Sequence, residues 1–346
     1  MLLIGFKSPH IKPNVAIDVM KKLEVIDFLR GFAIFTIVLM HCVQGYLAGV
    51  LHKAASLGGA GVHVFILCGG FGLYLSFLNN PLGYKDFLRK RFGKVYFPYV
   101  IVIALYALWG VAVAGGVNWV SVVSHVFLYK MFDNELDVSL CYPFWFISTI
   151  IQFYIFFPLI IRMIRIREGC LLALLTSLLW ATIVGWLGYE DYRPWGSFFL
   201  QYLWEFALGM WLAEKVKLSG WTEEKMMTRL KFWHLLLTMC AGMGLSALMA
   251  WNGGMLKLYN DIPSLVGYAS MLLIVYRVGI NWMNRFFRYT SKIGYEWYLV
   301  HSLTFIVVHH FMDGMMPMWI ILMICLIGSY GVAWLYYKLY HELTKI

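Results

Sequence analysis

The chain has 346 residues, of which 61% are hydrophobic, 18% are aromatic and only 13% are charged. Because a soluble domain carries about 25% charged residues, this composition excludes an ordinary water-soluble protein and predicts a surface that faces lipid. The formal net charge of +10 does not indicate a nucleic-acid partner, since the basic residues stand in short clusters between apolar runs.

Ten apolar runs predict membrane-spanning helices. Each is close to the roughly 20 residues that cross about 30 Å of hydrocarbon, and a helix satisfies its own backbone hydrogen bonds in lipid. In chain order the predicted spans are 28–50, 58–78, 95–115, 144–163, 169–187, 198–214, 232–251, 263–280, 293–312 and 317–340. A shorter run, 120–131, predicts an interfacial or re-entrant helix.

The positions of Lys and Arg predict the orientation of these spans. With the N-terminus inside, all but four of the 28 Lys and Arg residues fall in inner segments, and the outer four are Lys53, Lys130, Arg193 and Lys257. Cytoplasmic loops are enriched in Lys and Arg, so we expect both termini to be cytoplasmic. The prediction is an all-α integral membrane protein of about ten transmembrane helices, multi-pass in a bacterial cell membrane.

We expect a single membrane domain over residues 1–346, with a short cytoplasmic segment at 1–27 and no separate soluble domain. The spacing of the six cysteines matches neither a zinc site nor a redox pair. We therefore expect no metal and no redox cofactor.

Two ionisable residues stand out in the first predicted span, Arg30 and His41. At about 100° and 1.5 Å per residue, they share one helix face and lie roughly 16 Å apart. They therefore do not bond to each other, but they can contact two ends of one elongated ligand. Arg30 alone is also explained as an anchor at the helix end, whereas an imidazole deep in a span needs a polar partner or a function.

Three further ionisable residues lie within predicted spans: His63 about one turn into the second, Glu205 near mid-depth in the sixth, and His301 in the ninth. If these faces turn inward, His41, Glu205 and His301 are candidate acid or base groups. The alternative for each is a structural hydrogen bond between helices.

The stretch LEVIDFLRGFAIFTIVLMHC, Leu23–Cys42, resembles the first-helix signature of the acyltransferase-3 family of membrane acyltransferases. That signature has an L-R-G-x-A start and an arginine and a histidine separated by ten residues, as Arg30 and His41 are. The resemblance continues, in order, through GVHVFILCGGF, FLRKRFGKVYFPY, FWFISTIIQFYIFFPLI, WEFALGMWLAE and SKIGYEWYLVH. The family often has an aspartate where His63 stands and a serine where Cys68 stands, which suggests a divergent branch.

The resemblance implies acyl transfer from cytosolic acyl-CoA, commonly acetyl-CoA, to a hydroxyl of an extracytoplasmic glycan or lipid-linked saccharide. His41 is then the expected general base, with Glu205 or His301 orienting it or the acceptor. Roles are also expected for five other residues: Arg30, Arg91 and Lys94 bind the donor on the inner side, and His63 and Trp145 bind the substrate.

A transporter or flippase of an envelope glycan is the alternative from another class, because buried ionisable residues also mark transport pathways. It predicts movement of substrate down a gradient without dependence on acyl-CoA. The residues do not choose among acceptors, acyl groups or oligomeric states.

Overall fold

The computed structural model describes residues 23–344, which form helices joined by short turns, with no strand among them. The expected cytoplasmic segment 1–27 therefore lies mostly outside the described residues. The α-helices are α1 (Glu24–Val43), α2 (Gly49–Ser56), α3 (Gly61–Asn79), α4 (Tyr84–Ala112), α5 (Trp119–Val126), α6 (Asn134–Val138), α7 (Trp145–Ile164), α8 (Gly169–Trp186), α9 (Arg193–Gly196), α10 (Leu203–Ser219), α11 (Glu223–Arg229), α12 (Phe232–Asn252), α13 (Leu256–Tyr259), α14 (Asp261–Val278), α15 (Asn281–Met312) and α16 (Met318–Thr344). The 3₁₀ turns are η1 (Gln44–Tyr46), η2 (Leu57–Ala60), η3 (Tyr129–Phe132) and η4 (Tyr142–Phe144).

Eight segments within residues 23–344 are long and apolar enough to cross a membrane, and they coincide with eight of the predicted spans. The other two predicted spans correspond to α10, which has only 17 residues, and to α15, whose first half carries several charges. The prediction of an all-α integral membrane protein is confirmed. The short run 120–131 corresponds to α5 and η3, so a short helix does form there.

Several of the predicted boundaries were wrong, among them the start of the ninth span, since α15 begins at Asn281 and not at residue 293. The first span does not reach residue 50, because α1 ends at Val43 and the chain turns before Gly49, whose φ is +58°. The third span begins at Tyr84, eleven residues early, because Lys, Arg and Leu favour a helix even where hydropathy is low. Helix α10 begins only at Leu203, five residues after the predicted start, which puts Glu205 in its first turn.

The late start of α10 has a visible cause in two hydroxyl groups of neighbouring helices. Thr149 of α7 donates to the carbonyl oxygen of Ser197 at 2.6 Å, and Ser177 of α8 donates to that of Leu200 at 2.7 Å. Carbonyls bound in this way hold residues 197–202 as turns, which the apolar pattern alone does not reveal.

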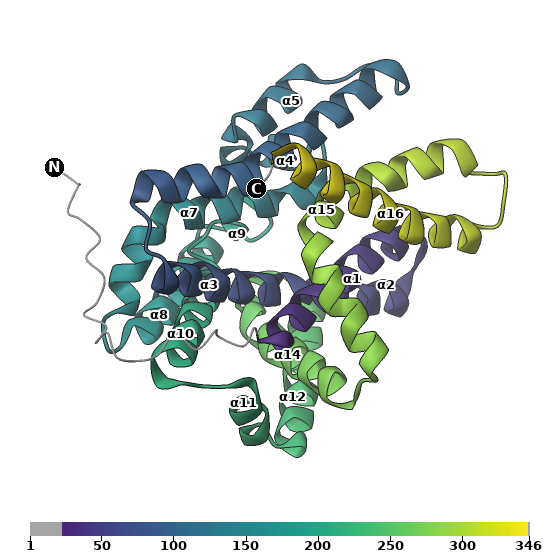
Figure 1. The fold of residues 1–346 in the computed structure, drawn as a ribbon. Coiled ribbons are helices and arrows are strands. Elements are labelled where there is room, and N and C mark those ends of the chain that lie inside the picture. The colour runs from purple at the N-terminus through teal and green to yellow at the C-terminus, as the bar shows by residue number, and fades with distance from the viewer. Residues whose placement is uncertain (1–22, 345–346) are drawn as a thin grey trace.

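Helix pairs far apart in sequence pack closely at glycines. A Cβ added to Gly31 of α1 would collide with the carbonyl oxygen of Phe287 on α15. Likewise, a Cβ on Gly70 of α3 would collide with the backbone of Phe206 on α10. Small residues let helix backbones approach in membranes. In Figure 1, α3 lies in the middle of the view, between α10 below it and the pair α4 and α7 above it.

The first turn of α1 is capped by a distant residue. Leu23, at the N-cap, offers no side-chain bond, and the backbone N–H of Val25 donates to Glu223 Oε2 of α11 at 3.1 Å. The other oxygen of Glu223 accepts from the Tyr276 hydroxyl at 2.5 Å. Because unpaired N–H groups at a helix start need acceptors, Glu223 fixes the end of α1 that precedes Arg30.

Candidate active site

A cavity of about 550 Å³ lies between α1, α3, α4, α7 and α15, with a contribution from α16. Helix α1 lines it with Arg30, Ile34, Ile37 and His41. These residues recur every three or four positions, as one face of a helix requires. The predicted common face of Arg30 and His41 is confirmed, and both residues reach the same space.

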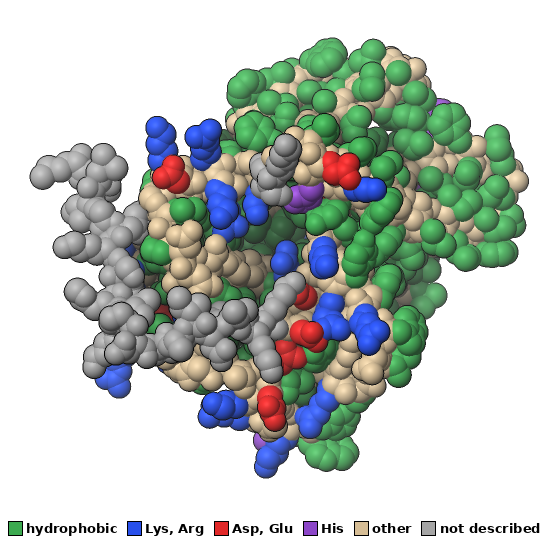
Figure 2. Space-filling model, viewed as in Figure 1, with side chains coloured by type: hydrophobic (Ala, Val, Ile, Leu, Met, Phe, Trp, Pro, Cys, Tyr) green, Lys and Arg blue, Asp and Glu red, His purple; other side chains and the backbone are tan. Residues whose placement is uncertain are grey.

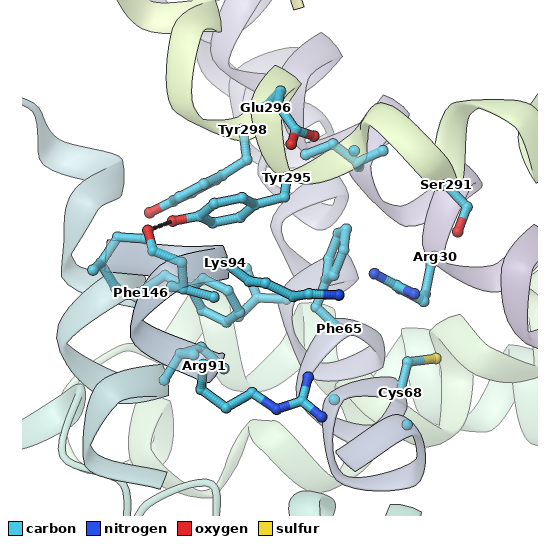
Figure 3. Close-up of a pocket in the computed structure, with 18 of the residues that line it drawn as sticks. Arg30, Phe65, Cys68, Arg91, Lys94, Phe146, Ser291, Tyr295, Glu296 and Tyr298 are labelled. Carbon is cyan, nitrogen blue, oxygen red and sulfur yellow. Dashed lines mark hydrogen bonds between the residues drawn. The ribbon is translucent and has the colours of Figure 1, made fainter. Parts of the chain in front are cut away.

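The Arg30 end of the cavity is strongly cationic. Five basic side chains line it, and Glu296 is the single carboxylate among the described lining residues. The five are Arg30, Lys90, Arg91, Lys94 and Lys292. Figure 3 shows Arg30, Arg91 and Lys94 pointing into one space, and Figure 2 shows Lys and Arg side chains around a hollow in this face of the molecule.

Three of these cations, Arg30, Arg91 and Lys94, have no carboxylate partner among the described residues, although Arg91 lies over the Phe87 ring at 5.7 Å. None of the three in Figure 3 forms a salt bridge with a carboxylate in residues 23–344, and the buried Nε of Arg91 has no hydrogen-bond partner there. Glu296 lies 4.0 Å from His341, at the edge of an ion-pair contact. Clustered unpaired cations repel one another, and a bound polyanion relieves that repulsion.

Helix α4 is held in place around its internal proline, Pro98. Proline cannot donate a backbone hydrogen bond and weakens a helix locally. Three tyrosine hydroxyls from α15 and α16 donate to carbonyl oxygens of this stretch: Tyr295 to Val95 at 2.6 Å, Tyr336 to Pro98 at 2.8 Å and Tyr340 to Gly93 at 2.7 Å. Figure 3 shows the Tyr295 bond as a dashed line. We call these three residues the tyrosine latch; it fixes the backbone that carries Lys94.

His41 lies at the other end of the lining face of α1. Its ring stacks on that of His301, with centroids 5.4 Å apart and planes inclined by 26°. His301 is fully buried; its Nδ1 donates to the Tyr298 carbonyl at 2.8 Å, so Nε2 accepts from the Ser302 hydroxyl at 3.0 Å. With both nitrogens of His301 engaged, its contact with His41 is stacking. Neither ring nitrogen of His41 has a hydrogen-bond partner within residues 23–344, which leaves them available to a ligand.

Trp145 lines the same cavity at the start of α7. The guanidinium of Arg193 lies 4.0 Å from the centroid of its ring, and the ring of Tyr202 lies nearly parallel at 6.0 Å. These contacts fix the orientation of the indole by cation–π and aromatic packing.

A buried ion pair supports the turn that precedes Trp145. Lys130 Nζ donates to Asp137 Oδ1 at 2.8 Å and to the carbonyl oxygen of Phe144 at 3.0 Å. The Lys130 side chain is fully buried, so burial lowers the pKa of its amine while the Asp137 carboxylate acts in the opposite direction. The Tyr298 hydroxyl donates to the same turn, at Pro143, at 2.5 Å.

His63 and Glu205 do not face the cavity. His63 Nδ1 lies 2.7 Å from Glu205 Oε1, and Nε2 lies 3.8 Å from Asp261 Oδ1. All three residues stand in the first turns of their helices, α3, α10 and α14. Glu205 therefore contacts His63 and not His41.

The structure thus brings together five of the eight predicted site residues around one cavity: Arg30, His41, Arg91, Lys94 and Trp145. His301 stacks on His41 but is not among the residues that line the cavity, and His63 and Glu205 form a separate cluster. The sequence analysis did not single out Tyr295, Lys292 or Asp261. Lys292 and Tyr295 both belong to the SKIGY motif, and both line the cavity. That motif therefore contained a signal for a binding site. Asp261 lies just before a predicted span, and the sequence around it did not mark it as a site residue.

Comparison with known proteins identifies the family of this chain. The family model described as an acyltransferase domain, of the acyltransferase-3 type, matches residues 23–338. Comparisons with curated proteins and with solved structures find no match. Because the family model covers nearly the whole chain, including the helices that build the cavity, the protein belongs to the acyltransferase-3 family and is a membrane acyltransferase.

Proposed function

We propose that the protein transfers an acyl group, most simply acetyl, from acyl-CoA to a hydroxyl of an extracytoplasmic or lipid-linked glycan. The observation that carries this proposal is one cavity with two features among residues 23–344: cations without salt bridges at one end, and at the other His41, whose ring nitrogens have no hydrogen-bond partner. An acyl-CoA donor has the matching shape: an anionic nucleotide, a long arm and a reactive thioester at the far tip.

In this proposal the cationic end binds the phosphates of the donor. Arg30 and Arg91 can each make two parallel hydrogen bonds to phosphate oxygens, while Lys94 acts as a point charge. With the N-terminus inside, as the charge distribution favours, this end opens to the cytosol, where acyl-CoA is found. The arm then extends along Ile34 and Ile37, which present an apolar wall between the two ends.

The proposed chemistry takes place at His41. The neutral imidazole accepts the proton of the acceptor hydroxyl as the oxygen attacks the thioester carbonyl carbon. The carbon–sulfur bond breaks, and the imidazolium returns the proton to the leaving CoA thiolate, so atoms and charges balance. A positioned general base of this kind contributes typically about 10²- to 10⁴-fold to rate. His301, bonded at both nitrogens, acts as a positioning residue that holds the His41 ring by stacking.

The acceptor is proposed to approach beside Trp145, near the His41 end. An aromatic ring fixed by neighbours loses little conformational entropy on contact with a sugar, and the Lys130 ion pair holds the turn that carries it. The proposed direction of transfer is therefore from a cytosolic donor to an acceptor on the opposite side.

The test is acyl-CoA turnover by purified protein in liposomes, with release of free CoA and labelling of envelope glycans measured together. We expect His41→Gln to lower kcat by about 10²- to 10⁴-fold with little change in the dissociation constant of CoA. For Arg30→Gln we expect the reverse, a CoA affinity weakened about tenfold or more, since a hydrogen bond to a charged group contributes about 1.5–3 kcal/mol.

Matched controls are His234→Gln, an exposed histidine on α12, and Arg167→Gln, an arginine on the surface. Both should turn over acyl-CoA like the unaltered protein. If the unaltered protein neither binds CoA nor transfers acetyl or succinyl groups to crude envelope glycans, the proposal is wrong. Gradient-driven movement of a glycan without CoA would then support the transporter.

A further inference from the structure

The second polar cluster of the molecule, His63, Glu205 and Asp261, lies outside the cavity and has no part in the proposed reaction; we call it the His63 cluster. It joins three helices, and one potential ligand atom from each residue lies within 4.8 Å of the others. Glu205 is fully buried, and the other two side chains are about seven-eighths buried, each 13% exposed. Buried carboxylates and imidazoles in membranes pair with each other or bind ions.

The hydrogen bonds indicate which nitrogen of His63 faces an ion. At 2.7 Å, Nδ1 donates its proton to Glu205 Oε1. On the opposite side, Nε2 lies 3.8 Å from Asp261 Oδ1, beyond hydrogen-bond range. When Nε2 gives up its proton to bind a metal ion, its lone pair and the Asp261 carboxylate oxygen face each other across this gap. Two ligands bound to one metal ion at about 2.0–2.2 Å each are separated by a similar distance.

The same pattern is common around protein-bound metals. A histidine ligand usually donates its second ring N–H to a carboxylate, which fixes the tautomer and the ring orientation. Glu205 occupies that position relative to His63. Its second oxygen, Oε2, is buried and has no hydrogen-bond partner within residues 23–344.

A neighbouring amide supplies a separate, unpartnered oxygen. Gln201 is 4% exposed, and its Nε2 donates to Asp261 Oδ2 at 2.7 Å. That bond places the amide group next to the cluster, and its oxygen Oε1 has no partner among the described residues. Amide and carboxylate oxygens together with an imidazole are a normal ligand set for divalent first-row metals.

The charge balance supports a divalent ion. Without an ion, a second proton on His63 balances one of the two carboxylates. A divalent ion that replaces this proton faces two ionised carboxylates and a neutral imidazole, which together carry two negative charges. The Tyr202 ring lies 6.0 Å from the His63 ring, and no salt bridge within residues 23–344 joins Arg193 to Asp261. One divalent ion neutralises the cluster fully.

We propose that the His63 cluster binds one divalent transition-metal ion, with Zn²⁺ as the best fit, through His63 Nε2 and Asp261, with Glu205 supporting His63. The ion ties together the starts of α3, α10 and α14. The role is structural: Tyr202 lies beside His63 and packs on Trp145, so the ion stabilises the outer layer of the cavity wall. The residues of the cluster are far apart in sequence, His63 and Glu205 by 142 positions, so sequence spacing predicted no metal.

The test uses full-length protein in detergent, treated with chelator, incubated with Zn²⁺ and freed of excess metal by gel filtration. Metal content per chain is measured by mass spectrometry, and thermal unfolding is followed with and without Zn²⁺. We expect about one Zn²⁺ per chain and a higher Tm with metal. Asp261→Asn and Glu205→Gln, which keep side-chain shape, should lose both effects. Asp313→Asn, at the exposed His309–Asp313 pair, should keep both.

The proposal is overturned if the unaltered protein retains no stoichiometric Zn²⁺ or Mn²⁺ and its Tm does not respond to either ion. It is equally overturned if Asp261→Asn and Glu205→Gln bind as much metal as the unaltered protein, since the ion would then lie elsewhere. None of these measurements depends on acyl transfer, so failure here leaves the proposed function untouched.

Discussion

Replacing Tyr295 by phenylalanine should weaken donor binding while leaving the chemical step unchanged. The substitution removes one hydroxyl of the tyrosine latch, which donates to the Val95 carbonyl at 2.6 Å. The ring stays in place and the cavity keeps its shape. Loss of this bond therefore loosens the backbone of α4 next to Lys94 and leaves the position of His41, at the far end of α1, unchanged.

The size of the effect follows from one hydrogen bond. A net contribution of about 0.5–1.5 kcal/mol corresponds to a factor of roughly 2 to 13, because about 1.4 kcal/mol is tenfold. The KM for acyl-CoA should therefore rise by about 2- to 13-fold in Tyr295→Phe, with kcat unchanged. The triple variant Tyr295→Phe, Tyr336→Phe, Tyr340→Phe should show a larger rise, though not the full product, since neighbouring effects are not additive.

The assay is the initial rate of CoA release at varied acyl-CoA and saturating acceptor, together with direct CoA binding by calorimetry. Tyr330→Phe is the matched control, because its hydroxyl bonds to Thr290 at 3.1 Å and does not reach α4. A fall in kcat at constant KM in Tyr295→Phe, or an equal rise in KM in Tyr330→Phe, would refute the role assigned to the latch.

Three further predictions concern stability, each measured as Tm or as the free energy of unfolding in detergent. Lys130→Met should destabilise the protein by about 3–5 kcal/mol, because it leaves Asp137 buried and unpaired. Adding Asp137→Leu to this variant should recover most of the lost stability. A double variant as unstable as the single one would contradict this. Glu223→Gln should cost about 1 kcal/mol by weakening the cap on Val25, and an unchanged Tm would show that the cap is dispensable. Gly70→Ala should lower the free energy of unfolding by about 1–3 kcal/mol through the clash with α10. Its control, Gly69→Ala, should leave stability unchanged, because a Cβ there meets nothing within 4 Å. Equal losses of stability in the two variants would argue against close packing as the cause.

The amino-acid sequence alone determined the local and periodic features of this protein. Lipid as solvent requires apolar runs of a certain length, so the positions of the spans could be predicted, although several of their ends could not. Helix periodicity placed Arg30 and His41 on one face, and the cavity confirms that both line the same space. The ordered motifs indicated the family that the comparison then established.

Hydropathy failed where charge or distant contacts override the apolar pattern. The first turns of α4 are charged yet helical, and α10 starts late because hydroxyls of α7 and α8 hold the preceding turns. Similarly, Lys130 was counted only as a loop cation, although it is fully buried in an ion pair. Burial of such a residue depends on what packs around it, which no local window contains.

Only the tertiary structure decided which residues meet. Periodicity fixes the face of each helix but not the neighbour of that face, and here close contacts at glycines select the pairs α1–α15 and α3–α10. The first pair stacks His301 on His41, and the second brings Glu205 to His63 instead of to His41. Such distances across the bundle depend on the packing of every helix at once, because the chain between the partners imposes no constraint on them.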